Sequence, residues 1–400
     1  MASTPLVQAS ESVYEPTWSG ESTSPPSAPT PAPSKVHLPG LDGVRAIAIL
    51  MVIVYHSLNG LPGMTRAQRL FLDLTGAGWV GVDLFFVLSG FLITGILMDS
   101  RNASHILRNF YVRRSLRIVP VYVAFLLFSL WIAAPLGTSS AEEVAQLHRT
   151  QVWFWTYTQN VLVALHSWDA TSFPMAHLWS LAVEEQFYLV WPIAVLLLSP
   201  ASLRRGAVVC ILAAEFFRLA LIQRGADGTV VFVMLPTRMD SLAAGAFLAC
   251  AYRDPVLWSQ VLRARKYLAT VAALCLVALL FFFHTIDKLA PLAQLVAFPA
   301  FVGLGAVVVA SAASGCAWLS GRTLRFIGKI SYGMYVWHLV VMRLILTQVS
   351  VPETTAPQAW WMFYAIMVVG TVCGTVVVAL ISWHVIERPF LQLKRFVPST

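Results

Sequence analysis

The sequence predicts an all-α fold: a polytopic membrane helix bundle of about ten transmembrane helices, with both termini in the cytoplasm. Two observations predict it. The chain of 400 residues is 58% hydrophobic and only 12% charged, so it is far more apolar than a soluble domain. Apolar stretches of about 20 residues, long enough to cross a hydrocarbon core of about 30 Å, recur along most of its length.

The start of the chain differs in composition from the rest. Residues 1–36 contain seven prolines among many serines and threonines, which predicts a disordered tail. The first long apolar run begins only at Val44, too late for a cleavable signal peptide. We therefore expect residues 37–395 to form the membrane domain of the mature protein and 396–400 a short C-terminal tail.

The predicted spans follow one another to the end of the membrane domain. Their approximate ranges are 43–60, 78–98, 118–136, 178–198, 207–224, 230–252, 267–284, 291–314, 326–348 and 361–386. With the N-terminus inside, the inside segments contain 18 of the 27 lysines and arginines and the outside loops five. An excess of basic residues is typical of cytoplasmic loops, and a count of eleven spans would put the two sides out of phase.

Charge and cysteine content exclude several function classes. The formal net charge of +8 comes from basic residues beside membrane ends, so it does not indicate nucleic-acid binding. The sequence shows no glycine-rich phosphate loop and no fixed-period repeat. No metal site is predicted, because the cysteines lie in apolar segments without metal-ligand spacing and are expected to be small core residues. They are Cys210, Cys250, Cys275, Cys316 and Cys373.

The first span, "LDGVRAIAILMVIVYHS", carries polar residues that a bilayer disfavours. Arg45 and His56 are eleven residues apart, which places them within about 20° of one helix face and about 16 Å apart along the axis. Asp42 lies one turn before Arg45. We expect this stripe to face the bundle interior, with His56 deep in the membrane. Alternatively, Asp42 and Arg45 only neutralise each other while His56 bonds a neighbouring helix.

The second and third spans add further candidates. "GVDLFFVLSGFLITGIL" places Ser89 and Gly90 in mid-span, where small residues permit close helix packing. Ser89 as an acyl-carrying nucleophile would need an adjacent base, and the sequence shows none beside it. In "NFYVRRSLRIVPVY", Arg114 and Arg117 lie one helical turn apart and could bind one anion through bidentate hydrogen bonds. Membrane topology alone would also explain this basic cluster.

The segment "HLWSLAVEEQFYLVWP" carries a polar helix face. Ser180, Glu184, Tyr188 and Trp191 share this face by helical spacing. A glutamate that paired with an intramembrane arginine would be structural. One that contacted His56 would orient the imidazole or raise its basicity.

Two later motifs also carry polar residues in spans. "PTRMDSLAAG" contains Arg238 and Asp240, which we expect to form an internal, structural pair. "ISYGMYVWHL" places Ser331 and His338 seven residues apart on one face, with Tyr335 next to His338. His338 either packs structurally or contacts substrate.

Together these motifs resemble the acyltransferase-3 family of integral-membrane O-acyltransferases, which includes enzymes that modify O-antigens, Nod factors and macrolides. The resemblance covers residues 37–395 and six motifs in order. They are "LDGVRAIAI" with ten residues between Arg45 and His56, "GVDLFFVLSGFLI", "RRSLRIVPVY", "HLWSLAVEEQFYLVWP", "SYGMYVWHL" and "ERPF".

The resemblance implies a multi-pass enzyme of the cytoplasmic (plasma) membrane. It would take an acyl group from cytoplasmic acyl-CoA, usually acetyl-CoA, and transfer it to a hydroxyl of a carbohydrate, a lipid-linked glycan or a glycosylated small molecule. No permanently bound cofactor is implied. Some members carry a fused extracytoplasmic esterase-like domain; none is expected here, so the membrane domain or a separate partner would complete transfer.

The resemblance also implies roles for the polar residues. His56 would be the general base that deprotonates the acceptor hydroxyl. Glu184, with Asp42 as a lesser candidate, would orient His56 or support Arg45. The remaining candidates would bind the coenzyme A donor at the cytoplasmic mouth: Arg45, Arg114, Arg117 and His338.

Two other function classes are less consistent with the sequence. A secondary transporter would also have ten spans and buried ionisable groups, but inverted repeats and broken helices are its better signature, and the sequence shows neither. A structural scaffold would not need so many polar residues in its spans. The aromatic outside segment, residues 137–177, either lies over the active site or supplies ordinary interfacial anchors.

Overall fold

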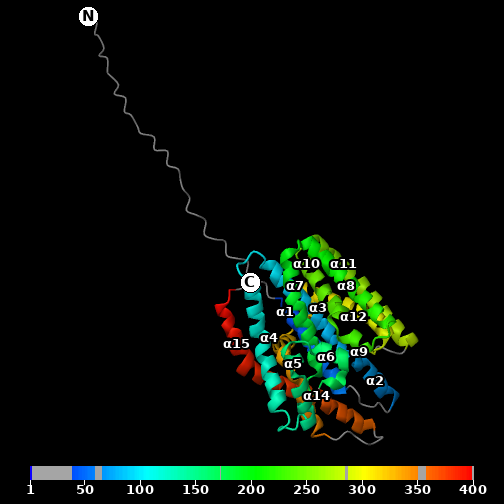
Figure 1. Cartoon of the computed structure of the whole chain (residues 1–400). Helices are drawn as coiled ribbons and strands as arrows, with labels where there is room; N and C mark the ends of the chain where they lie inside the picture. Colours follow the sequence, from blue (N-terminus) through cyan, green and yellow to red (C-terminus); the bar gives the residue numbers. More distant parts are fainter. Residues whose placement is uncertain (2–37, 59–64, 172, 284–286, 350–356, 399–400) are drawn as a thin grey trace. The chain divides into compact units, whose positions relative to one another are not determined.

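The computed structural model describes residues 38–58, 65–171, 173–283, 287–349 and 357–398, together with Met1. Across these residues the chain is helical and forms no strand, which confirms the predicted all-α class (Figure 1). Apart from Met1, the tail predicted over 1–36 lies outside the described residues. So do the ends of two predicted spans, at 59–60 and 284, and the last two residues of the chain.

Nine helices in the described ranges are long and apolar enough to cross a membrane, and they coincide with nine of the ten predicted spans. The tenth, 326–348, falls in α13, which is 25 residues long but carries several basic side chains. The long helices are α1 (Pro39–Leu58), α3 (Gly81–Asp99), α4 (Ile106–Trp131), α7 (Trp179–Leu197), α8 (Pro200–Gln223), α10 (Leu235–Tyr252), α11 (Pro255–Ala278), α12 (Phe298–Ala313), α13 (Arg322–Leu346) and α14 (Pro357–Ser382).

Short helical elements connect or extend the long helices. The α-helical ones are α2 (Arg66–Gly76), α5 (Ala141–Trp155), α6 (Gln159–His166), α9 (Gly228–Val233) and α15 (Arg388–Gln392). Three are π-helical: η4 (Leu279–Phe283), η5 (Ala293–Ala297) and η7 (Trp383–Glu387). The 3-10 turns are η1 (Ala77–Val80), η2 (Trp168–Ala170), η3 (Ala176–Leu178), η6 (Ala317–Ser320) and η8 (Leu393–Phe396).

Local sequence explains where several helices begin. α5 starts with a capping box, in which the Ser140 side chain accepts from the backbone of Glu143 and the Glu143 side chain accepts from the backbone of Ser140. Asp254 caps α11 through the amides of Val256 and Leu257, and Pro255 follows as the first helical residue. These signals fix the ends of helices whose interiors are set by apolar composition.

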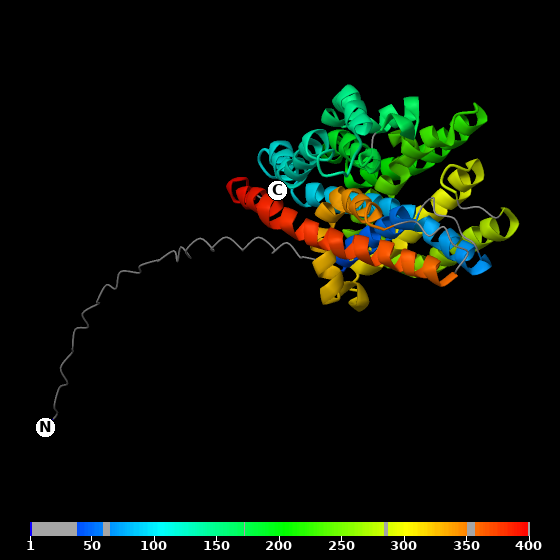
Figure 2. The same cartoon turned by 90° about the horizontal axis from the view of Figure 1, so that it is seen from below.

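Glycines allow the central helices to approach very closely. A Cβ built on Gly90 of α3 would lie 1.9 Å from the Leu242 carbonyl oxygen of α10, and one on Gly245 of α10 would lie 1.9 Å from the Val87 carbonyl oxygen of α3. The same distance separates a Cβ on Gly328 of α13 from the Asp42 carbonyl oxygen of α1. The predicted packing role of Gly90 is therefore confirmed. Figure 2 shows α14, in orange and red, along the bundle beside α1 and α13.

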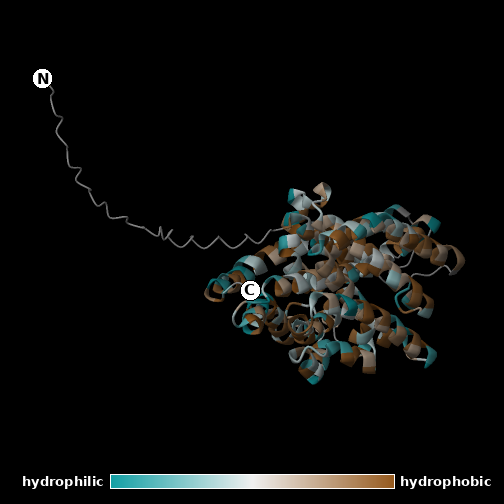
Figure 3. Ribbon diagram, turned by 90° about the horizontal axis from the view of Figure 1, so that it is seen from above, coloured by the Kyte–Doolittle hydropathy of each residue, from teal (hydrophilic) through white to brown (hydrophobic). Residues whose placement is uncertain are grey.

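The outer helices present apolar side chains away from the bundle. In the most apolar stretch of α8 only 17% of the residues are buried, and in α11 only 11%, against 78% in the stretch that includes α3. Hydrophobic residues, brown in Figure 3, lie on outer helices as well as in the interior. Leu212, Phe216 and Leu274 are each more than 60% exposed, as expected of helices that face lipid.

Buried ion pairs connect the inner helices. Arg238 Nη2 lies 2.6 Å from Asp83 Oδ1, and Arg218 Nη1 lies 2.7 Å from Asp240 Oδ2. The predicted pair of Arg238 with Asp240 is therefore wrong. Residues two apart on a helix point in directions that differ by about 200°, so each finds a partner on a different helix.

Candidate functional site

The cytoplasmic end predicted for α1 carries an ion pair. Arg45 Nη1 lies 2.5 Å from Asp42 Oδ1, and both side chains are less than one-fifth exposed. A Cβ on Gly43 would lie 1.9 Å from the Leu319 carbonyl oxygen, so glycine lets η6 pack against this turn. Asp42 thus supports Arg45, one of the two roles expected for it.

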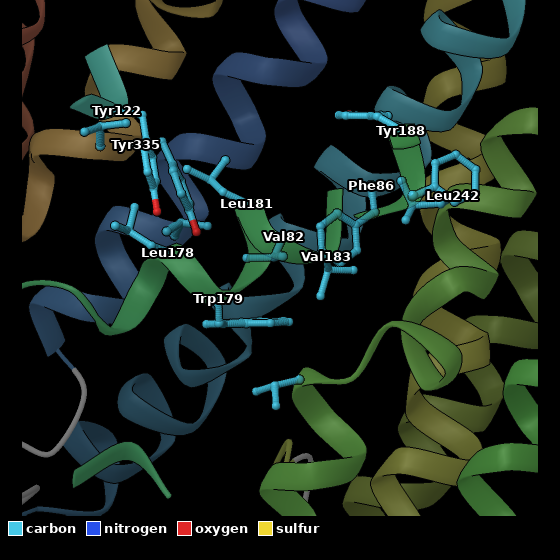
Figure 4. Packing of buried hydrophobic residues seen from close by; sticks show 14 of the residues in the cluster. Val82, Phe86, Tyr122, Leu178, Trp179, Leu181, Val183, Tyr188, Leu242 and Tyr335 are labelled. Atoms are coloured by element: carbon cyan, nitrogen blue, oxygen red, sulfur yellow. The ribbon is translucent and has the colours of Figure 1, made fainter. Parts of the chain in front are cut away.

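A second charged cluster joins α4 and α7. Arg114 Nη2 lies 3.9 Å from Glu184 Oε2, and its Nε lies 3.7 Å from Glu185 Oε1. The guanidinium lies 3.7 Å from the centre of the Tyr188 ring, which is cation–π geometry. Figure 4 shows Tyr188 and Val183 of α7 packed near Phe86 and Leu242. This cluster corresponds to the structural alternative in which a glutamate pairs with an intramembrane arginine.

The structure gives Ser89 a partner that the sequence did not reveal. Its hydroxyl donates to Glu184 Oε1 at 2.7 Å, across 95 residues of chain. The contacts found for Glu184 in the described part of the chain join it to Ser89, to Tyr188 and to the arginines Arg114 and Arg117, and none joins it to His56. Its expected role as an orienting carboxylate for His56 therefore stays a prediction without a direct contact.

The three predicted donor-binding arginines come together. Arg117 interacts electrostatically with Arg45 of α1 and with Arg114, its neighbour on α4. Glu387, from the "ERPF" motif, is 5% exposed and also interacts with Arg117. Three guanidiniums at one end of the bundle form a basic site that suits a polyanion such as a phosphorylated coenzyme.

A hydrogen-bonded layer lies between α7 and α13. The Ser180 and Tyr335 hydroxyl oxygens are 2.5 Å apart, and the Tyr335 hydroxyl donates to the His177 carbonyl at 2.6 Å. Both side chains are buried, and Figure 4 shows Tyr335 beside Leu178 and Leu181 at the start of α7. This layer joins the glutamate face of α7 to a cluster of histidines.

Three histidines form that cluster. His56 Nδ1 lies 3.1 Å from His338 Nε2, and the centre of the His338 ring is 5.0 Å from the ring centres of both His56 and His177. His338 is fully buried and His177 is 3% exposed. The family resemblance implied that His338 binds the donor, whereas the structure places its ring against His56. His177 was not singled out; its only signal is its position three residues before Ser180.

An aromatic box lies next to the histidines. The Lys288 ammonium lies about 5 Å from the ring centres of Tyr55, Trp168 and Phe232, and it interacts electrostatically with His56. Cation–π contacts of this kind attract the lysine ammonium to the ring faces and do not require a carboxylate partner. A positive charge is thereby fixed beside the candidate base.

The aromatic segment 137–177 places its side chains in two different environments. Trp168 and His177 reach the site, whereas Trp155 is 42% exposed on the surface. Tyr157 stacks on Tyr122 with ring centres 4.4 Å apart. Burial raises the pKa of the Tyr157 phenol well above its usual value, so this hydroxyl stays neutral.

Two clusters of polar side chains lie at different positions along α1. A cluster of arginines lies around Arg45, and a cluster of histidines lies around His56, about 16 Å further along the helix axis. Two hydrogen-bonded pairs adjoin these clusters: Ser180 with Tyr335 beside the histidines, and Ser89 with Glu184 beside Arg114. Within the described ranges no group of three or more His, Cys, Asp or Glu could hold a metal ion.

Comparison with known proteins is consistent with this geometry. The family described as an acyltransferase domain matches residues 38–380. The peptidoglycan O-acetyltransferase OatA of Listeria monocytogenes is 30% identical over 373 residues, which cover 89% of this chain and 56% of the relative. The putative peptidoglycan O-acetyltransferase YrhL of Bacillus subtilis is 29% identical over 377 residues, 88% of this chain and 55% of the relative. This chain thus spans about half the length of the curated relatives it matches. No solved structure matches it.

Proposed function

Because the chain belongs to the acyltransferase-3 family, we propose that it is a membrane O-acyltransferase that moves an acetyl group from cytoplasmic acetyl-CoA to a hydroxyl of a carbohydrate acceptor. One observation carries the proposal: α1 bears both a residue of the arginine cluster and the histidine of the imidazole cluster. The names of the relatives support peptidoglycan as the acceptor.

The reaction follows from the two clusters. The arginines bind the phosphates of the donor, and its thioester extends along the polar path toward His56. His56 takes the proton from the acceptor hydroxyl as the hydroxyl oxygen attacks the thioester carbonyl. The tetrahedral intermediate then collapses to the ester, and the coenzyme A thiolate leaves and takes up the proton from His56. The Lys288 charge stabilises the oxyanion electrostatically.

The direct test is transfer of label. Inverted membrane vesicles that contain the protein would receive acetyl-labelled coenzyme A together with a lipid-linked peptidoglycan precursor. We expect an alkali-labile acetyl group on the glycan. Label that accumulated inside the vesicles without any acetylated glycan would contradict the proposal and favour a transporter.

The donor site can be tested at Arg117, whose side chain is exposed and interacts electrostatically with Glu387. We expect Arg117→Gln to raise the KM for acetyl-CoA about tenfold, because one charge-assisted hydrogen bond to a phosphate is worth about 1.5–3 kcal/mol. The kcat should stay nearly constant. The matched control is Arg108→Gln, which removes another exposed arginine of α4; equal KM values in the two variants would refute a phosphate contact at Arg117.

The proposed orientation, with both termini in the cytoplasm, rests on the distribution of basic residues. In a cysteine-free background, Arg149→Cys should react with a membrane-impermeant maleimide from outside the cell. Arg108→Cys should react only after permeabilisation. Both positions are exposed, so access depends on the side of the membrane, and the opposite labelling pattern would reverse the topology.

A further inference from the structure

The ring of His338 has a defined hydrogen-bonding state. Its Nδ1 lies 2.7 Å from the Tyr335 carbonyl oxygen. A carbonyl oxygen only accepts, so Nδ1 carries a proton and donates. In the neutral imidazole, Nε2 of His338 then carries the lone pair, and it faces His56 Nδ1 at 3.1 Å.

The tautomer of His56 follows from its two neighbours. Its Nδ1 lies 3.0 Å from the Val52 carbonyl oxygen as well as 3.1 Å from His338 Nε2. Both neighbouring atoms are acceptors, so Nδ1 of His56 must carry the proton that they share. If His56 carried its proton on Nε2 instead, lone pairs of His56 Nδ1, His338 Nε2 and the Val52 carbonyl oxygen would face one another with no proton between them. Nε2 of His56 is therefore the nitrogen with a free lone pair.

We propose that His338 is a positioning residue that fixes His56 as the tautomer with Nε2 as the base. This inference rests on the proposed function. When Nε2 takes the acceptor proton, His56 becomes an imidazolium, and its Nδ1–H bond to neutral His338 becomes a charge-assisted hydrogen bond. His338 thus stabilises the state that forms during the reaction and performs the role that a carboxylate has in a Ser-His-Asp triad.

The surroundings of the pair support this role. His338 is fully buried, and contacts with the rings of His177 and Tyr335 limit its movement. Tyr335 also donates to the His177 backbone, which ties α13 to the start of α7. Both nitrogens of His338 are occupied, one by Tyr335 and one by His56. This leaves neither nitrogen to bind the donor, so the inference differs from the donor-binding role expected from the sequence.

Two variants of His338 separate positioning from packing. His338→Leu removes one of the two acceptors of the His56 Nδ1–H, and we expect kcat to fall about 100-fold because the imidazolium that forms in the reaction loses a charge-assisted hydrogen bond. His338→Gln keeps an oxygen acceptor for His56 Nδ1–H, and its kcat should return to within about tenfold of the wild type. The KM for acetyl-CoA should stay constant in both variants. The control, His166→Leu, changes a histidine that is exposed at the end of α6 and should leave kcat unchanged.

Three results would overturn the proposal: an unchanged kcat in His338→Leu, no recovery in His338→Gln, or a rise in the KM for acetyl-CoA. Nitrogen NMR of ¹⁵N-histidine in the wild type, assigned with His56→Ala, supplies a readout that needs neither activity nor a stable His338 variant. It should show His56 protonated at Nδ1 and unprotonated at Nε2. The reverse state would refute the proposal even if acetyl transfer were established, whereas the expected state without any transfer would refute only the enzyme assignment.

Discussion

Replacement of His56 by alanine is expected to lower the rate of acetyl transfer by about 10²–10⁴-fold, the usual contribution of a positioned general base. The described hydrogen bonds of the ring join it to Val52 and His338, so the variant should insert and accumulate. The measurement is label transferred from acetyl-CoA to glycan per amount of protein in the membrane. An accumulated His56→Ala protein with full activity would remove His56 as the base.

Chemical rescue provides the control for this experiment. The truncation leaves a space of imidazole size beside His338, so added imidazole should restore part of the activity of His56→Ala. It should not restore activity to Arg117→Gln, whose expected defect lies in donor affinity. Rescue of both variants would indicate an effect of imidazole that does not depend on this site.

Removal of one partner from the Asp83–Arg238 pair should produce the largest loss of stability. Both side chains are 1% exposed and 2.6 Å apart, and the Ser241 hydroxyl also donates to Asp83. Arg238→Leu leaves the carboxylate buried without its counter-charge, so we expect the free energy of unfolding to fall by about 3–5 kcal/mol. Equilibrium unfolding in detergent micelles would measure this change.

Two further variants test whether the uncompensated charge of Asp83 causes the loss of stability in Arg238→Leu. The double variant Asp83→Leu with Arg238→Leu removes both charges and should recover most of the lost stability. Arg204→Gln breaks a half-exposed pair with Asp254, 3.6 Å apart, and should cost less than about 1 kcal/mol. A double variant no more stable than Arg238→Leu would show that packing, and not an uncompensated charge, determines the loss.

The spans could be predicted well from the sequence, because each crossing of the lipid bilayer requires a continuous apolar segment of about 20 helical residues. The sequence also placed Arg45 and His56 on one face, since helical periodicity fixes angles within a helix. The clustering of Arg45 with Arg114 and Arg117 was predicted from the family resemblance. These parts of the site depend on residues near one another in the chain or on motifs that recur across the family.

Contacts between helices could not be predicted in the same way. Spacing gives a residue's direction on its own helix, but not which neighbouring helix lies there. The wrong pairing of Arg238 and the unexpected contact of Glu184 with Ser89 both have this cause. His338 is a similar case: its position on α13 was known, but its contact with His56 depends on how α1 and α13 pack.

The reciprocal approach of Gly90 and Gly245 to opposing backbone carbonyls has a consequence for laboratory evolution. Even alanine at either position would force α3 and α10 apart, and with them Ser89 and the Asp83–Arg238 pair. Random libraries aimed at new acceptors should therefore tolerate almost no diversity at these two codons.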